Sequence, residues 1–112
     1  METNKDSLFE GMYIISATLS DDARAKAMEK ILEGITQRGG EIHKQHDLGR
    51  CKLAYDIRGR KEGHYYVVFF SINPCHIDEL WKDYHLHEDL LRFMTLRAEN
   101  VQEELTFKSA AE

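Results

Sequence analysis

The feature that most limits the possible folds is the stretch from Gly49 to Phe70, which reads as two extended segments folded back on each other. Leu53–Ile57 and Tyr65–Ile72 are rich in aromatic and branched residues, as β-strands are. Between them, Arg58–Gly63 is a polar connection with two glycines, which predicts a long β-hairpin. The connection carries three basic residues, Arg58, Arg60 and Lys61, so if a negatively charged polymer contacts the protein, this hairpin is the first candidate site.

A strand and a helix are predicted before this hairpin. Phe9–Leu19 contains the continuous apolar run Met12–Ile15, which is typical of an interior strand covered on both faces. Ser20 is a suitable helix N-cap, and Gly39-Gly40 supplies the positive φ at which a helix ends. Between them, apolar residues recur at the spacing of one helical face: Met28, Ile31, Leu32 and Ile35. The opposite helical face mixes charges of both signs, and we interpret it as solvated surface rather than as a binding stripe.

The remaining elements are predicted from similar signals. From Glu41 the chain is extended but irregular, and Gly49 predicts a bulge or bend in a long, polar edge strand. After the hairpin, Asn73 as N-cap and Pro74 at the first helical position predict a second helix. Its buried face is expected to carry Ile77, Leu80, Trp81 and Tyr84. Leu90–Leu96 is the expected last strand.

This order of elements predicts an α+β fold of the ferredoxin-like βαββαβ type. Its four-stranded antiparallel sheet would have the order 4-1-3-2, with both helices on one face and the other face left for solvent or a partner. A chain of 112 residues suits one domain. We place that domain at residues 9–98, between a flexible N-terminal segment, 1–8, and an acidic C-terminal tail, 99–112.

The sequence lacks the motifs of catalytic and cofactor sites. It has neither a G-x-x-x-x-G-K-(S/T) loop nor a G-x-G-x-x-G turn. His43 and His46 fall on opposite faces of a strand, while His85 and His87 share a face but have no convincing further ligand nearby. We therefore expect no enzymatic activity, no metal, no cofactor and no small-molecule substrate.

The cysteines and the absence of long apolar runs indicate the cellular compartment in which the protein is expected. Cys51 and Cys75 lack both zinc-type spacing and a secretory context, so two free thiols in a reducing cytosol are expected. No stretch approaches the roughly 20 apolar residues of a membrane span, and Met1–Glu10 has no apolar run long enough for a signal peptide. The sequence thus favours a cytoplasmic protein without a membrane partner.

Five short motifs occur in order between about Phe9 and Arg97. They are Phe9-Glu10, Gly49-Arg50-Cys51-Lys52-Leu53-Ala54-Tyr55, Gly63-His64-Tyr65, Asn73-Pro74 and Leu90-Leu91-Arg92-Phe93-Met94. In this order and spacing they resemble the bacterial small-subunit ribosomal protein S6 family. The resemblance implies a non-catalytic structural protein of the 30S subunit, located on the cytoplasmic ribosome. It also implies that the protein binds the central domain of 16S rRNA together with ribosomal protein S18, among other 30S subunit proteins.

The resemblance implies candidate site residues as well. Because the formal net charge is -5, RNA contact requires a local cluster of cations. Arg50, Lys52 and Arg92 match basic positions of the family motifs, Arg97 matches one more loosely, and the hairpin adds Arg58, Arg60 and Lys61. Some family members carry Arg where this chain has His85, His87 and Leu91, so a weaker contact is expected near the last strand. The protein partner is expected on the exposed sheet face and the tail, near Tyr55, Tyr65 and Phe107.

A small-molecule-sensing regulatory module is the alternative that the fold leaves open. Modules of this topology bind ligands at strand ends or dimer interfaces and need no fixed motif. Without the resemblance, the cations of the hairpin would be equally consistent with a charged, solvated edge. Binding that falls as salt rises would distinguish the RNA-binding hypothesis from the sensor.

Overall fold

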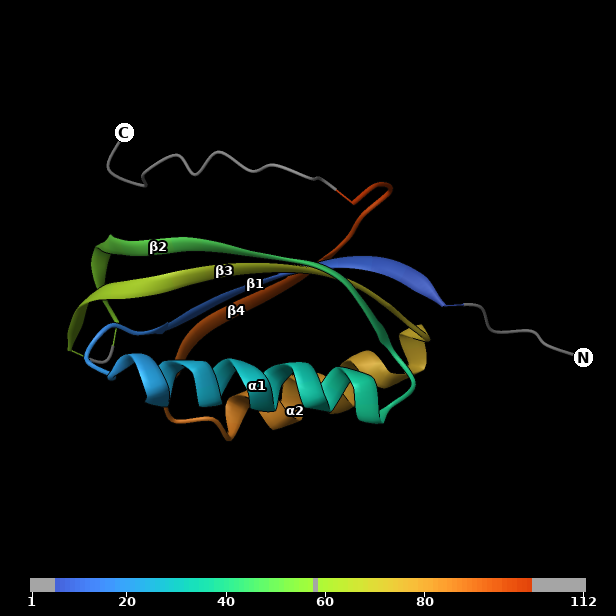
Figure 1. The fold of residues 1–112 in the computed structure, drawn as a ribbon, viewed down its shortest axis with the longest axis horizontal. Helices are drawn as coiled ribbons and strands as arrows, with labels where there is room; N and C mark the ends of the chain where they lie inside the picture. Colours follow the sequence, from blue (N-terminus) through green and yellow to red (C-terminus); the bar gives the residue numbers. More distant parts are fainter. Residues whose placement is uncertain (1–5, 58, 102–112) are drawn as a thin grey trace, which may run out of the picture.

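The computed structural model describes residues 6–57 and 59–101, without the side chains of 54–57 and 60. In chain order the elements are β1 (Ser7–Ser16), α1 (Asp21–Gln37), β2 (Glu41–Ile57), β3 (Arg60–Ile72), the short 3-10 helix η1 (Pro74–His76), α2 (Ile77–His85) and β4 (Leu90–Arg97). The strands form one antiparallel sheet in the order β2-β3-β1-β4 (Figure 1). This order is the predicted 4-1-3-2, and the ferredoxin-like α+β fold is confirmed.

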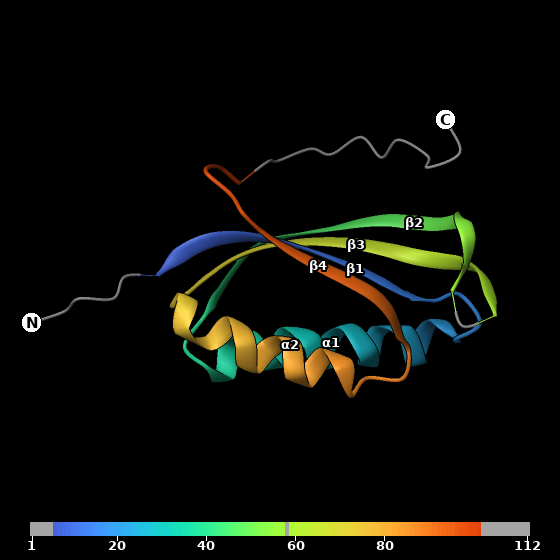
Figure 2. The ribbon, with the colours of Figure 1, turned by 180° about the vertical axis from the view of Figure 1, so that it is seen from behind.

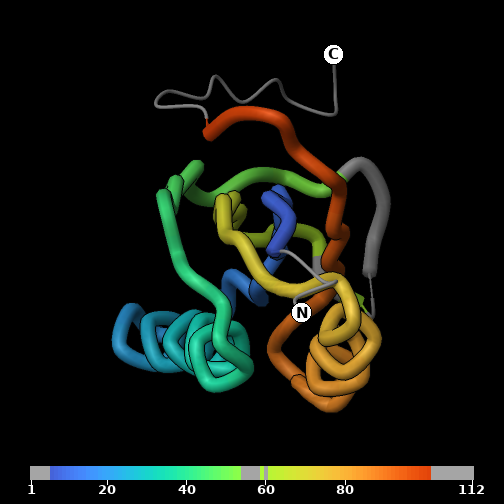
Figure 3. Tube along the Cα trace, turned by 90° about the vertical axis from the view of Figure 1, so that its right-hand side faces the viewer, coloured from blue at the N-terminus to red at the C-terminus, as the bar shows by residue number. Residues whose placement is uncertain are grey.

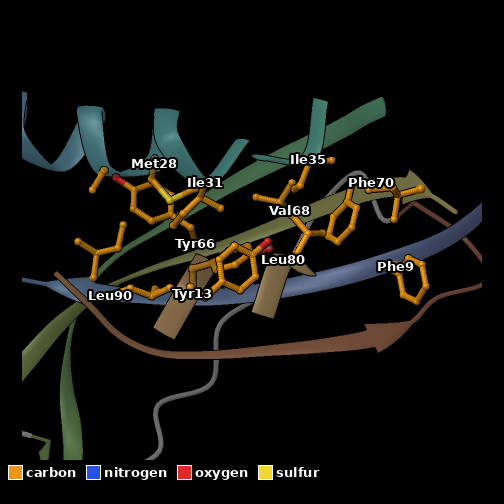
Figure 4. Packing of buried hydrophobic residues seen from close by; sticks show 14 residues of the cluster. Phe9, Tyr13, Met28, Ile31, Ile35, Tyr66, Val68, Phe70, Leu80 and Leu90 are labelled. Atoms are coloured by element: carbon orange, nitrogen blue, oxygen red, sulfur yellow. Dashed lines mark hydrogen bonds between the residues drawn. The ribbon is translucent and has the colours of Figure 1, made fainter. Parts of the chain in front are cut away.

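Both helices cover the same face of the sheet, and Figures 1 and 2 show them side by side beneath it. The end-on view in Figure 3 shows the two layers, with α1 and α2 next to each other. Alternate residues of β1 and β3, among them Tyr13 and Phe70, point into the core between the layers (Figure 4). From the helices, Met28, Ile31, Ile35 and Leu80 complete this core.

The predicted caps of α1 are confirmed by local contacts. The Ser20 hydroxyl accepts a hydrogen bond from the Ala23 amide at 3.2 Å, which satisfies one of the free amides of the first turn. At the other end, Gly39 has a φ of 85°, a conformation that costs little for glycine. Both signals lie within a few residues of the helix end that they define.

Three sequence-based expectations were wrong in detail. β1 runs over Ser7–Ser16 rather than Phe9–Leu19, because its pairing with β3 starts at Ser7 and ends at Ser16. β3 begins at Arg60, so the predicted connection Arg58–Gly63 is mostly strand and the turn is short. Trp81 was expected in the core but is 40% exposed, since it lies at the margin of α2 over the edge strand β4.

The β2–β3 ribbon extends beyond the rest of the sheet. β1 pairs with β3 only from Gly63 onward, so residues 60–62 of β3 pair with β2 alone. The predicted bulge is present at Gly49, where the register shifts and φ is 88°. This part of the ribbon therefore projects past the end of β1, and no third strand pairs with residues 60–62 of β3 (Figure 1).

The face of the sheet opposite the helices is only partly open. Ile14, Tyr65 and Leu91 form a small buried cluster there, with Leu48, Cys51 and Leu53 packed against it. The chain after β4 reaches this face as well, since Ala98–Asn100 borders a cavity of about 290 Å³ with Glu10 and Phe69. On β4, however, Met94 and Leu96 remain 50% and 53% exposed. The expected free surface on this face thus lies mainly along the β4 edge.

Candidate nucleic-acid interface

The β2–β3 ribbon brings three of the predicted RNA-binding residues together. Arg50, Lys52 and Lys61 are all exposed. Arg50 lies opposite His64 and Lys52 lies opposite Glu62, so both cations share the ribbon face on the side of the helices. Arg50 and Lys61 border a groove of about 350 Å³ with the β1–α1 loop at Ala17 and Thr18. Glu62 also lines this groove, so a phosphate group that met the two cations there would compete with its carboxylate.

Arg50 is already engaged by a neighbouring carboxylate. Its Nε donates a hydrogen bond to Glu62 Oε1 at 2.6 Å, and 65% of the Arg50 side chain remains exposed. An exposed ion pair of this kind is weak, because water and salt screen it. The arginine can therefore be withdrawn from Glu62 by a stronger anion such as phosphate.

Two further residues of this region, His64 and Arg24, were not predicted as site residues from the sequence. His64 Nε2 lies 2.6 Å from Asp47 Oδ1, and the His64 ring stacks on Tyr66 with centroids 4.8 Å apart. The Tyr66 hydroxyl in turn accepts a hydrogen bond from Arg24 Nε at 2.9 Å. These contacts join residues 17 and 42 positions apart, so only strand register reveals them. Ion pairs and stacking thus continue from the ribbon to the start of α1.

The predicted cations of β4 lie elsewhere. Arg92 is opposite Ile14, which belongs to the small cluster on the face away from the helices, so it does not share a face with Arg50. Arg97 is near the other end of β1, where its guanidinium lies 5.7 Å from the centre of the Phe9 ring and donates to the Ser7 hydroxyl at 3.0 Å. The cations therefore form separate groups rather than one patch.

The expected protein-binding residues are only partly placed. Tyr65 is buried in the small cluster on the open face, and burial raises the pKa of its phenol. The side chain of Tyr55 is not described, and neither is that of Arg60. Arg58 and Phe107 lie outside the described residues. Exposed apolar side chains on this face of the sheet come instead from Met94 and Leu96, further along β4.

A sequence model of ribosomal protein S6 matches residues 8–97, about four-fifths of the chain. The small ribosomal subunit protein bS6 of Chlamydia pneumoniae is 59% identical over 112 residues, all of both chains. The protein of the same name from Chlamydia caviae is 57% identical over the same full length. The chain belongs to the ribosomal protein S6 family.

The structure agrees with this family. The crystal structure of 30S ribosomal protein S6 from Thermotoga maritima matches with a TM-score of 0.79 at 29% identity, covering 84% of this chain and 89% of that one. The matched span of the S6 family, 8–97, contains the whole ribbon and all of β4. The fold predicted from the order of elements and the family predicted from the five motifs are thus both confirmed.

Among the residues that the structure describes, no group of three or more His, Cys, Asp or Glu side chains is arranged to hold a metal ion. Over the same part of the chain, no helix is long and apolar enough to cross a membrane. Cys51 is half-buried, Cys75 is exposed, and both are free thiols. Burial raises the pKa of the Cys51 thiol, which makes that cysteine less reactive.

Proposed function

We propose that this protein is a structural component of the small ribosomal subunit in the cytoplasm, where it binds the central domain of 16S rRNA together with ribosomal protein S18. The observation that carries the RNA contact is the exposure of Arg50, Lys52 and Lys61 on the β2–β3 ribbon, with Arg50 and Lys52 on the same face. A net charge of -5 disfavours RNA at long range, so these cations must act locally. Arg92 and Arg97 are secondary contacts in this proposal, as are Arg58 and Arg60.

We propose that the protein partner binds the open face of the sheet beside β4. Met94 and Leu96 are exposed there, on the same face of the sheet as the buried Tyr65 cluster, and they offer apolar surface to a second protein. Tyr55 and Phe107 remain proposed contacts from the ribbon and the tail. A partner bound here leaves the Arg50 face of the ribbon free for RNA, because the two surfaces lie on opposite faces of the sheet.

The small-molecule sensor receives less support from the described residues. Ligand pockets are predominantly apolar and enclose their ligand. The cavity of about 580 Å³ between α1 and β2 is lined mostly by charged and polar side chains, among them Arg24, Lys26, Glu29 and Asp47. Such a lining is typical of solvated surface.

A charge-reversal experiment tests the RNA contact. We expect Arg50→Glu with Lys52→Glu to weaken filter binding of the central-domain 16S rRNA, in the presence of the partner protein, by about tenfold or more. The matched control is Lys26→Glu with Lys30→Glu on the exposed face of α1, which changes the net charge equally. Equal binding by wild type and the ribbon variant, or equal loss in both variants, would refute the assignment.

A further inference from the structure

The Trp81 side chain is partly exposed, and its contacts with β4 fix its orientation. It is the one tryptophan of the chain, and 40% of its surface is exposed on α2. Its Nε1 donates a hydrogen bond to Thr95 Oγ1 of β4 at 3.2 Å, and its ring centroid lies 6.4 Å from that of Phe93. The indole therefore has its polar atom satisfied within the protein while part of its aromatic surface faces outward.

A second aromatic side chain, that of His85, lies on the same side of α2 as Trp81. His85 follows Trp81 by four residues, so both project from the same side of α2. The His85 ring meets Phe93 edge to face, with centroids 5.1 Å apart, and the side chain is exposed. Tyr84 packs behind Phe93 at 5.0 Å and fixes it from the core. We refer to Trp81, His85 and Phe93 as the α2 aromatic platform.

The charges of α2 are distributed unevenly around this platform. Glu79 and Asp83 turn toward α1, where Arg38 contacts them at 3.0 and 2.9 Å. The last turn of α2 carries the basic residues Lys82 and His85. Lys82 is exposed, and no ion pair joins it to another residue in the part of the chain that the structure describes. Asp78 is the exposed carboxylate that remains one turn before Trp81.

We propose that the α2 aromatic platform stacks an unpaired base of the ribosomal RNA, an inference that rests on the proposed function. Stacking needs only an accessible π-face, and every base has one. The indole N–H is held by Thr95, so the exposed ring offers stacking surface rather than a free hydrogen-bond donor. Lys82, the next residue along α2, is exposed and adds a positive charge beside the platform, which favours a phosphate-bearing ligand. The platform is thus an RNA contact by stacking, separate from the Coulombic contact of the ribbon.

The test uses the full chain, the central-domain 16S rRNA and the partner protein. We expect the RNA to quench the emission of Trp81, with the Trp81→Phe variant in the same mixture as the blank. Filter binding should weaken roughly 5- to 100-fold in Trp81→Leu, because one base–aromatic stack is lost. It should recover to within a few-fold of wild type in Trp81→Phe, which keeps an aromatic ring. Leu86→Ala, at a residue 82% exposed on the same helix end, is the control and should bind as wild type does.

Three results would overturn this inference. If the RNA binds but Trp81 emission is unchanged and Trp81→Leu binds like wild type, the platform makes no contact while the ribbon assignment stands. If emission responds to the partner protein alone and not to RNA, the platform is a protein-docking surface. If wild type itself fails to bind RNA in the filter assay, both the proposed function and the stacking site are wrong. Urea unfolding of Trp81→Leu and Trp81→Phe checks that both variants are folded.

Discussion

Arg50 Nε and Glu62 Oε1 lie 2.6 Å apart across the β2–β3 ribbon, so the central cation of the candidate RNA surface is paired with a carboxylate in the free protein. Any phosphate that binds Arg50 competes with Glu62. The carboxylate also repels the RNA backbone directly. Glu62 is therefore expected to weaken RNA binding and to limit contact with other anions.

Removing this carboxylate is expected to strengthen RNA binding. An exposed ion pair is worth up to about 1 kcal/mol, so Glu62→Gln should raise the affinity for central-domain rRNA about two- to fivefold. Filter binding at fixed salt measures the change. Glu41→Gln, at the exposed far end of β2, alters the net charge equally and should have a smaller effect. An equal gain in both variants would mean that net charge, rather than release of Arg50, controls binding.

The hydroxyls of Tyr13 and Tyr84 form a buried pair that a double-mutant cycle can measure. They lie 2.8 Å apart, and burial raises the pKa of Tyr84 to about 12. Tyr13→Phe or Tyr84→Phe leaves the other hydroxyl unpaired in the core, which should lower the free energy of unfolding by about 1–3 kcal/mol. The double variant leaves no orphaned hydroxyl, so it should cost less than the sum of the two single changes. Additive losses in urea unfolding would show that the two hydroxyls do not stabilise each other.

Acid should weaken the link between the two helices. Hydrogen bonds from Arg38 and then His76 hold the pKa of Glu79 below its usual range. A carboxyl whose pKa is lower in the folded state stabilises the fold above its unfolded pKa, and this contribution is lost as pH falls through the folded value. The urea midpoint of wild type should therefore exceed that of Glu79→Gln near neutral pH, and the difference should shrink as the pH falls below about 4.

A control separates this effect from a general change in charge. Glu33→Gln removes one exposed carboxylate from α1 without touching Arg38. Its urea midpoint should stay close to that of wild type across the same pH range. A difference between wild type and Glu79→Gln that does not depend on pH would contradict the assigned role of the Glu79 carboxylate.

The elements that were predicted correctly depend on short-range signals. Ser20 and Gly39 define the ends of α1 through contacts within a few residues, and Asn73 caps the following segment by accepting a hydrogen bond from the Cys75 amide at 3.0 Å. The strand order followed from the number and polarity of the strands. Local chemistry and hydrophobic pattern were thus sufficient for the architecture.

The contacts that the sequence did not predict depend on the register between strands and on how the edge strands of the sheet are covered. The pairs Arg50–Glu62 and His64–Asp47 exist because the Gly49 bulge sets which residues share a face of the ribbon. The periodicity of α2 placed Trp81 correctly on the side of the sheet, and the predicted strand order made β4 an edge strand, but neither showed that 40% of the indole stays exposed. The positions of these residues in the fold, rather than their residue types, therefore make the proposed ribbon contact and the α2 aromatic platform two distinct sites.

The close approach of the strands at Gly63 provides a final test of the fold that holds the ribbon. A Cβ at Gly63 would overlap Cγ2 of Ile14, so Gly63→Ala should lower the free energy of unfolding by about 1–3 kcal/mol through overpacking. At Gly34, inside α1, a new Cβ would have its nearest neighbour, Leu80 Cδ2, at an ordinary 3.6 Å. Gly34→Ala should therefore raise the free energy of unfolding by about 0.5–1 kcal/mol, because alanine favours the helix. Changes in the free energy of unfolding that had the same sign for the two alanine variants would refute this packing of β3 on β1.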